Sequence, residues 1–254
     1  MSKKMVLLMM TLVLLAAGAT SGCRRVKLAD TAGAGARDEG RTVGLGEASS
    51  LKTSVRMAVG TLTLAAAEPS STLALDATFT YPQASWKPKV DFSVEATHGT
   101  LSVAQPEVSG FPGISLGTIG EGDNTWRLKL AAGVPTDLSL QLGVGDSDVK
   151  LAGIDVTTLH VVSGVGKTKL DLTGPRTHDL KGSVESGVGQ VNITVPSGVG
   201  VKLTGGAEGV GELTAPGFVK SDGALVNSAW AGSGPKMELD LTRGVGEIKV
   251  TSVD

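Results

Sequence analysis

The segment SGVGKTKL, residues 163–170, has the residue types of a phosphate-binding loop. Its glycine, lysine and threonine at 166–168 match the end of the G-x-x-x-x-G-K-[ST] motif, in which backbone N–H groups and the lysine hold a nucleotide phosphate. That motif needs a glycine five positions earlier, where this chain has Val161, and a helix after the loop. The residues that follow instead alternate between apolar and polar up to a Gly-Pro pair, which is typical of a strand. The segment therefore predicts no nucleotide site.

The same Gly-Val-Gly unit recurs along the chain. Aligned copies begin at residues 143, 164, 187, 209 and 244. The first four start 21, 23 and 22 residues apart, and the fifth follows after 35 with an insertion between. A period near 22 residues indicates a solenoid, in which each repeat packs only against its neighbours. A degenerate copy stands at Ala58-Val59-Gly60, whereas the Gly-Val-Gly at 198–200 aligns with the other strand of the repeat.

The residue directly after each copy indicates where Lys167 points. The equivalent positions carry Asp146, Gln190, Glu212 and Glu247. A position that accepts either sign of charge faces solvent, so Lys167 is expected to point at water. The glycines are expected at corners between strands, where they supply a positive φ or a close backbone approach. The valine between them is expected to point inward.

The composition indicates an all-β chain. Phe, Trp and Tyr together make up 3% of the residues, whereas Gly accounts for 36 of 254. Small branched residues and abundant glycine suit short, closely stacked strands, and no long stretch after residue 50 has helical apolar spacing. Each period holds two strands and two corners, which predicts a single-stranded β-helix, or solenoid, of about 22-residue rungs. A β-sandwich of short strands is the alternative.

The N-terminus has the pattern of a targeting segment. Two lysines precede an apolar run of 15 residues, Met5–Ala19, which is shorter than the roughly 20 residues that span a bilayer. The only cysteine, Cys23, directly follows Ser21-Gly22. This arrangement resembles a bacterial lipoprotein signal, although Thr20 departs from the usual leucine. We expect cleavage before Cys23 and attachment of lipid (palmitate) to it; ordinary cleavage after Ala19 is the alternative.

These patterns divide the chain into three parts. Residues 1–22 are the expected lipoprotein signal peptide, 23–50 the lipid anchor and flexible tether, and 51–254 the β-solenoid, irregular over 51–133 and repetitive over 134–254. Cleavage removes two of the 23 basic residues and none of the 25 acidic ones, which leaves a charge of about −4 (21 − 25). With no basic patch, nucleic acid is not an expected partner. The expected location is the cell envelope, lipid-anchored to a bacterial membrane and facing the periplasm or the exterior.

Besides the repeats, five short stretches follow one another in a specific order. They are Trp86–Val90, Trp126–Leu128, Val134–Leu138, Ala215–Phe218 and Val226–Trp230. In this order they resemble the toast-rack domains, bacterial domains of unknown function that are similar to the β-helical extracytoplasmic part of LiaF-type cell-wall-antibiotic response proteins and to adhesin modules. The resemblance covers about residues 50–254. It implies a single-stranded β-helix and no established activity, so it supplies no functional residues.

Clusters that suit catalysis or metal binding are not evident in the sequence. His98, His160 and His178 have no neighbour at metal-ligand spacing, and a lone cysteine leaves no zinc site. Asp146-Ser147-Asp148 beside a glycine is similar to calcium-binding repeats, but the equivalent positions change to lysine and glutamine in the following copies. We therefore expect no enzyme, no metal and no cofactor.

The expected function is that of a non-enzymatic, membrane-anchored envelope lipoprotein, a binding or scaffolding module for an envelope protein or glycan. A sensory or regulatory component of an envelope-stress or cell-wall-antibiotic response is the alternative. The insertion over 217–233 carries Phe218 and Trp230, the expected partner contacts. The same insertion is equally suited to cap the apolar end of the solenoid, because solenoids need such caps.

Overall fold

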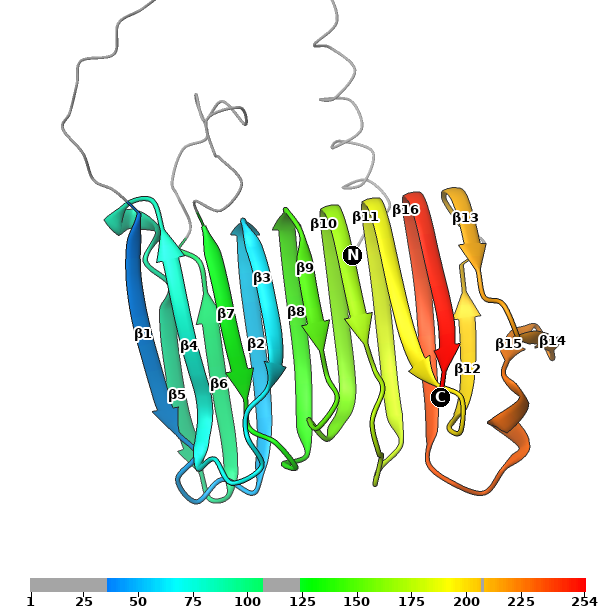
Figure 1. The fold of residues 1–254 in the computed structure, drawn as a ribbon, viewed down its shortest axis with the longest axis horizontal. Coiled ribbons are helices and arrows are strands. Elements are labelled where there is room, and N and C mark those ends of the chain that lie inside the picture. Colours follow the sequence, from blue (N-terminus) through cyan, green and yellow to red (C-terminus); the bar gives the residue numbers. More distant parts are fainter. Residues whose placement is uncertain (1–35, 107–123, 207) are drawn as a thin grey trace, which may run out of the picture. The chain divides into compact units, whose positions relative to one another are not determined.

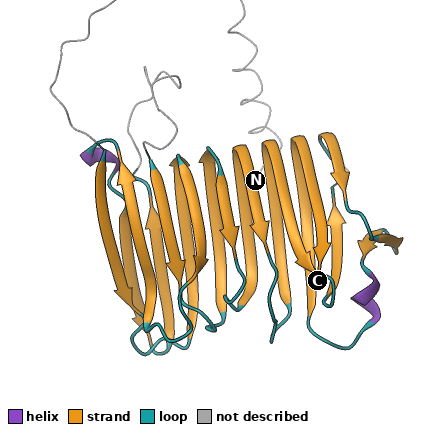
Figure 2. Cartoon of the chain, in the orientation of Figure 1, coloured by secondary structure: helices purple, strands orange, loops and turns teal. Residues whose placement is uncertain are grey.

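The computed structural model of the chain describes residues 36–106, 124–206 and 208–254; the expected signal peptide and Cys23 lie outside them. Most of the described residues lie in sixteen β-strands, and two short 3-10 helices, η1 (Ala84–Trp86) and η2 (Ser228–Ala231), accompany them. Figure 2 shows the strands side by side, joined by short loops. The all-β prediction is confirmed.

The strands form two layers, one behind the other in Figure 1, and the chain crosses between them at the Gly-Val-Gly corners. The first layer has the order β5 (Lys89–Glu95), β6 (His98–Ala104), β2 (Ser50–Val59), β8 (Thr136–Val144), the N-terminal halves of β10 (Val156–Asp171), β11 (Leu180–Pro196) and β16 (Lys236–Val253), then β12 (Gly200–Gly205), β15 (Ala224–Val226) and β14 (Val219–Ser221). The second layer has the order β1 (Arg37–Gly44), β4 (Leu73–Tyr81), β7 (Thr125–Leu130), β3 (Thr61–Ala66), β9 (Ser147–Lys150), the C-terminal halves of β10, β11 and β16, and β13 (Val210–Thr214).

One strand from each layer, with the corner between them, makes up a rung. Strand β2 continues as β3 past Gly60, and β8 continues as β9 past Gly145, whereas β10, β11 and β16 run through the corner unbroken. Neighbouring rungs pair in parallel with the corners in register, so that Val165 lies between Val144 and Val188. This parallel stacking confirms the solenoid prediction.

The spatial order of the rungs departs from the sequence order near both ends. The β16 rung, last in the sequence, lies between β11 and the β12/β13 rung, and the β6/β7 rung lies on the far side of β2/β3 from β8/β9. The copies at 187 and 209 are successive in the sequence but are not neighbours in the stack, because the copy at 244 lies between them. The β16 strand pairs along its length with β11 on one side, and with β12 and β13 on the other.

Alternate residues of the rungs point between the two layers and form the core. One inward row, opposite one another across four rungs, consists of Leu140, Val161, Val184 and Leu241. Branched side chains of this size fill the narrow space between the layers, which explains why so few aromatic residues are needed. Larger rings lie on the antiparallel strands β4 and β7. Phe79 of β4 and Trp126 of β7 meet edge to face, with ring centroids 5.4 Å apart.

The folded domain begins earlier than the sequence indicated. Residues 37–44, expected in the flexible tether, form β1, which pairs antiparallel with β4. Glu39 fastens this strand: the Tyr81 hydroxyl donates a hydrogen bond to its Oε2 (2.8 Å), and Lys87 pairs with the same oxygen (2.9 Å). The hydrogen bond from Lys87, followed by that from Tyr81, lowers the pKa of Glu39. The sequence did not reveal this strand because residues 37–44 contain few apolar residues and the strand they pair with, β4, is distant in the sequence.

Candidate interaction surfaces

Glycine is required at both corner positions because the neighbouring rung approaches so closely. Gly166 has a φ of +138°, and a Cβ atom there would meet the carbonyl oxygen of Gly145, well inside the 3.0 Å that real Cβ atoms keep. The first glycine of the same corner, Gly164, faces Gly143 in the same way. The expected close backbone approach is confirmed, and it runs along the stack, from one corner to the next.

The degenerate first copy has alanine where the other copies have their first glycine. On one side of Ala58 lies Gly143, and on the other lies the β6/β7 rung, in which β6 ends at Ala104 and β7 begins at Thr125. Gln105 lies on the β6/β7 side of Ala58, and its Oε1 accepts hydrogen bonds from the N–H groups of Ala58 (2.9 Å) and Val59 (3.2 Å). A side chain rather than a corner glycine is the neighbour, so a methyl group fits.

The valine of each corner points outward, and the inward orientation expected from the sequence is wrong. In β10 the buried residues on either side of the corner are Ser163 and Thr168, five positions apart, so the alternation of the strand is interrupted between them. Val165 lies at the apex of this bend and is 48% exposed. Because the chain turns around this residue from one layer to the other, its side chain has space only on the outside.

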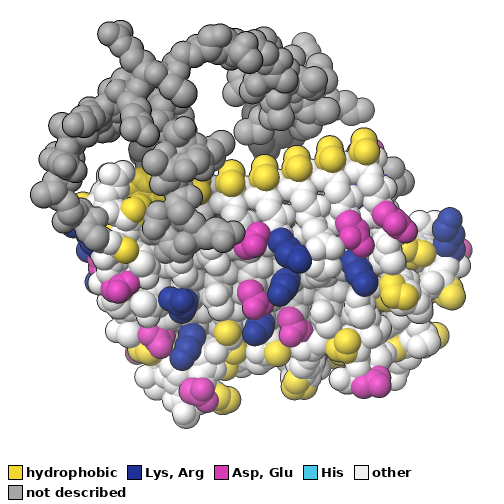
Figure 3. Space-filling model, turned by 45° about the horizontal axis from the view of Figure 1, so that its top comes forward, with side chains coloured by type: hydrophobic (Ala, Val, Ile, Leu, Met, Phe, Trp, Pro, Cys, Tyr) yellow, Lys and Arg dark blue, Asp and Glu magenta, His cyan; other side chains and the backbone are white. Residues whose placement is uncertain are grey.

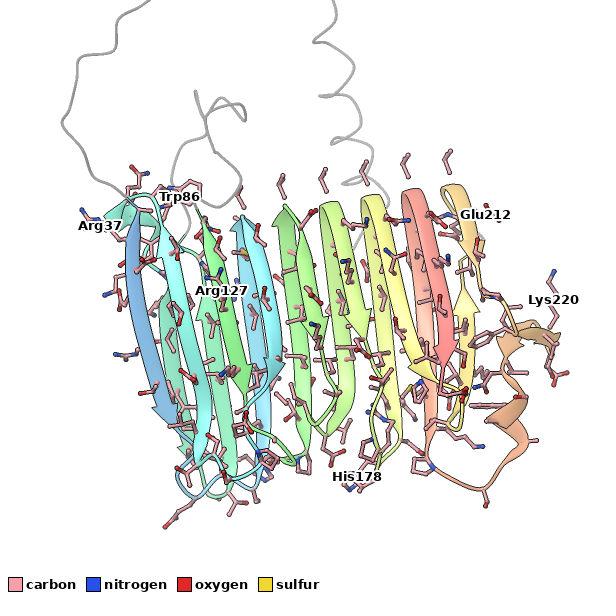
Figure 4. The ribbon with its side chains drawn as sticks, viewed as in Figure 1. Arg37, Trp86, Arg127, His178, Glu212 and Lys220 are labelled. Carbon is pink, nitrogen blue, oxygen red and sulfur yellow. The ribbon has the colours of Figure 1, made fainter. Side chains whose placement is uncertain are left out.

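Together these side chains form a continuous apolar strip, here called the valine ridge. In rung order it consists of Val144 (39% exposed), Val165 (48%), Val188 (49%), Val245 (43%) and Val210 (69%). Figure 3 shows it as an even row of hydrophobic side chains along one edge of the domain, and in Figure 4 side chains stand clear of the ribbon along that edge. Glycines border the ridge on both sides.

Lys167 lies on the outer side of the second layer and is exposed, as expected. Its backbone N–H donates a hydrogen bond to Asp146 Oδ1 (2.9 Å) in the neighbouring rung, and one rung further Gln190 Nε2 donates to Glu247 Oε2 (2.9 Å). Residues 163–170 belong to strand β10, which continues straight to Asp171 without opening a helix. The segment is thus a corner of the solenoid.

A hydroxyl cluster lies buried beneath the corners, and the sequence analysis did not single it out. Thr168 Oγ1 is its centre, 3.0 Å from Ser147 Oγ and 2.9 Å from Ser163 Oγ. In later rungs the place of Thr168 is taken by Val191 and Ile248, which are also buried. The cluster satisfies its own hydrogen bonds inside an otherwise apolar row, so its role is structural.

Each histidine has a nearby hydrogen-bond partner from an adjacent strand or loop. His98 Nδ1 lies 2.7 Å from Ser50 Oγ, and His160 Nδ1 lies 2.6 Å from Ser183 Oγ. His178 Nδ1 lies 2.7 Å from Asp155 Oδ2, in the loops opposite the valine ridge (Figure 4). Among the described residues no group of three or more His, Cys, Asp and Glu side chains could hold a metal ion.

A Gly-x-Ser-x-Gly sequence, residues 113–117, lies outside the described residues. In hydrolases this motif places its serine on a turn from a strand to a helix. The described elements that precede and follow it are the strands β6 and β7.

The insertion that carries Phe218 and Trp230 covers the end of the first layer. Its strands β14 and β15 extend the sheet beyond β12, and Asn227 fastens them: Asn227 Oδ1 accepts from Val201 N–H (2.9 Å), and its Nδ2 donates to the Val199 carbonyl (2.7 Å). Phe218 packs half-buried against the core. Trp230, also half-buried, lies near Lys202 and Lys236, whose Nζ atoms are 5.7 and 5.3 Å from its ring centroid.

None of the helices in the part of the chain that the structure describes is long and apolar enough to cross a membrane.

The family comparison fits the solenoid of stacked rungs. Residues 32–194 match the family model described as the N-terminal domain of toast_rack, DUF2154. The chain belongs to this family. The matched part of the toast-rack chain holds β1 to β10 and nearly all of β11, whereas the rungs from β12 to β16 lie beyond it.

Solved structures give a second comparison. A structure from Clostridium sporogenes ATCC 15579, named a "putative cell adhesion protein", matches with a TM-score of 0.79 at 29% identity and covers 86% of the toast-rack chain and 100% of its own. Two structures named "putative adhesin", from Bacteroides fragilis NCTC 9343 and Parabacteroides merdae ATCC 43184, share 11% identity, cover 84% and 86% of this chain and 97% of their own, and have TM-scores of 0.28 and 0.21, too low to support an argument. No curated protein matches the chain.

Proposed function

We propose that this toast-rack protein is a non-enzymatic binding module of the bacterial cell envelope, held at a membrane by lipid on Cys23. The observation that carries the proposal is the similarity to the clostridial protein named for cell adhesion, which extends over all of that chain. The lipoprotein-like Ser21-Gly22-Cys23 supports the anchor. Residues 24–36 would then join the anchored cysteine to the domain that begins with β1 at Arg37.

The outer face of the second layer is the surface best suited to a partner. Charged side chains of both signs lie close together on it, as Figure 3 shows. Lys167 and Lys169 are exposed on β10, and exposed acidic residues flank them in neighbouring rungs, Asp146 on one side and Glu212 further along. A flat face of extended polar side chains favours a partner that is also flat and polar.

A protein surface fits this face better than a glycan. Sugar rings are commonly held against exposed aromatic faces, and here Trp126, Phe79 and Tyr81 are buried in the core. Trp230 is half-buried beneath two lysines at one end of the stack. We therefore favour an envelope protein as the partner.

Photocrosslinking in cells tests this proposal. A photoreactive residue is placed at Lys169 on the second layer, at Lys181 on the first layer and at Trp230 in the insertion, and captured proteins are identified by mass spectrometry. We expect one dominant envelope protein at Lys169, much reduced at Lys181 and lost when Cys23→Ala releases the chain from the membrane. Capture of no protein at any of the three positions, with the chain present at its usual amount, would overturn the binding function. A sensor kinase as the captured protein would favour the regulatory alternative.

A further inference from the structure

The valine ridge contributes little to holding the solenoid together. The glycines beside it are needed for stacking, but the valine side chains themselves are 39–69% exposed. Five such side chains, each one strand separation of about 4.8 Å from the next, form a strip about 19 Å long. Scattered exposed valines are ordinary, whereas a contiguous strip indicates an interaction surface.

We propose that the valine ridge joins two copies of this chain edge to edge, around a twofold axis that passes beside Val188. The same edge carries a ridge of side chains and, next to it, tracks of glycine that have none, both with one residue per rung. The ridge of one copy can therefore lie against the ridge of the other, and the bare glycine tracks on both sides leave room for the two edges to approach. Both copies then contribute the same apolar row, as a twofold interface between identical copies requires.

The charges beside the ridge favour two copies that run in opposite directions. In rung order the adjacent row of the second layer carries Asp146, Lys167, Gln190, Glu247 and Glu212. Reversed about Gln190, this row places Lys167 of each copy opposite Glu247 of the other and brings the two Gln190 amides together. Asp146 and Glu212 meet only at the two ends, where water and salt screen their repulsion.

Copies that run in the same direction would gain no such pair. A twofold axis along the ridge would set the second layer of one copy against the first layer of the other. Lys167 would then lie opposite Val162 of its own rung, and Gln190 opposite Glu185. Neither contact pairs opposite charges, so the antiparallel arrangement is favoured.

A bilayer is a poorer occupant of this edge than a second copy. The row beside the ridge holds three carboxylates, Asp146, Glu247 and Glu212, against one lysine, Lys167, and anionic head groups would repel it. The ridge itself consists of valine, without the Trp, Tyr, Lys or Arg that anchor proteins at membrane interfaces.

The size of the strip sets the strength of the contact. A strip one side chain wide falls below the roughly 800 Å² per partner of a standard stable interface, so the dimer is weak in dilute solution. It becomes populated where copies are concentrated, as they would be on one membrane. That enrichment rests on the proposed lipid anchor, whereas the edge contact itself does not.

Disulfide trapping tests the contact directly. The full chain carries Cys23→Ser, so that each introduced cysteine is the only thiol and no lipid is attached. Val188→Cys should form a disulfide dimer under mild oxidation, because residues beside a twofold axis bring their Cα atoms within the ~7 Å that a disulfide spans. Val144→Cys and Val210→Cys should each remain monomeric alone but crosslink when mixed. Val219→Cys, which is 64% exposed on β14 and off the ridge, is the matched control.

Sedimentation velocity of the same chain gives a second readout without oxidation. Val188→Lys should raise the dimer dissociation constant about tenfold or more, because two ammonium groups would face each other at the axis. Val219→Lys should leave it unchanged. Trapping of Val188→Cys no faster than Val219→Cys, or self-trapping of Val144→Cys as fast as Val188→Cys, would overturn the proposal. Failure of partner capture in cells would leave these results untouched, so the two proposals can fail separately.

Discussion

Gly166 lies so close to Gly145 that the carbonyl oxygen of Gly145 occupies the space a Cβ atom on Gly166 would need. The same relationship repeats along the stack, and it includes Gly246, which is next to Gly189 although a whole rung separates them in the sequence. The corner glycines are therefore a contact between rungs as much as a turn within one.

Gly166→Ala should destabilise the domain by about 3 kcal/mol or more, because the methyl group meets backbone that cannot move aside and the positive φ is strained for alanine. Gly198→Ala is the matched control: it also belongs to a Gly-Val-Gly, but nothing lies within 4 Å of its Cβ position. Chemical denaturation of both variants measures the difference. Equal midpoints for the two variants would contradict the close approach between corners.

Thr168→Val should cost about 1–2 kcal/mol of unfolding free energy, since it leaves the buried hydroxyls of Ser147 and Ser163 without their shared partner. Replacing all three, Ser147→Ala, Ser163→Ala and Thr168→Val, should recover most of the loss, because the neighbouring rung already holds Val191 at the place of Thr168. A triple variant less stable than the single one would show that the cluster itself stabilises the fold.

The attachment of β1 should weaken in acid. The pKa of Glu39 is lowered in the folded protein, chiefly by the hydrogen bond from Lys87 and then by that from Tyr81. Its contribution is therefore present above the unfolded value of about 4.3 and is lost as the pH falls through the lower folded value. Hydrogen exchange of the β1 amides, followed from neutral pH to about pH 3, measures this. Glu39→Gln should flatten the dependence; an unchanged profile would remove Glu39 from the attachment.

Two variants in the insertion over 217–233 should distinguish its structural role from its role in binding. Asn227→Ala should lower stability by about 2 kcal/mol, because it leaves the buried N–H of Val201 unpaired. Trp230→Ala should change the melting temperature much less, since a half-buried ring near two lysines contributes about 1 kcal/mol. If Trp230 is a partner contact, its variant should nevertheless reduce capture in cells. Normal capture by a folded Trp230→Ala variant would leave the insertion as a cap.

Some features of the fold could be predicted from local pattern. The spacing of Gly-Val-Gly, the alternation after each copy and the scarcity of aromatic residues were enough for an all-β solenoid with Lys167 facing solvent. These features depend on contacts within one rung or with an equivalent rung, and such contacts leave a period in the sequence.

Other features depended on which rung lies beside which. The place of β16 between β11 and β13, the pairing of β1 with β4, and the alanine at position 58 all follow from neighbours that are distant in the chain. No periodic signal records them, because any Gly-Val-Gly corner fits beside any other.

The direction of the corner valines shows most clearly where prediction from the sequence ends and the tertiary structure decides. From the sequence alone, the valines flanked by glycine within a strand pattern were expected inside. The period and composition of the chain predicted the solenoid, but they did not determine the direction of these valines. Whether Val165 points into the core or away from it depends on the sense in which the chain bends between the two layers. That bend is a property of the stacked rungs, so the ridge became visible only in the assembled structure.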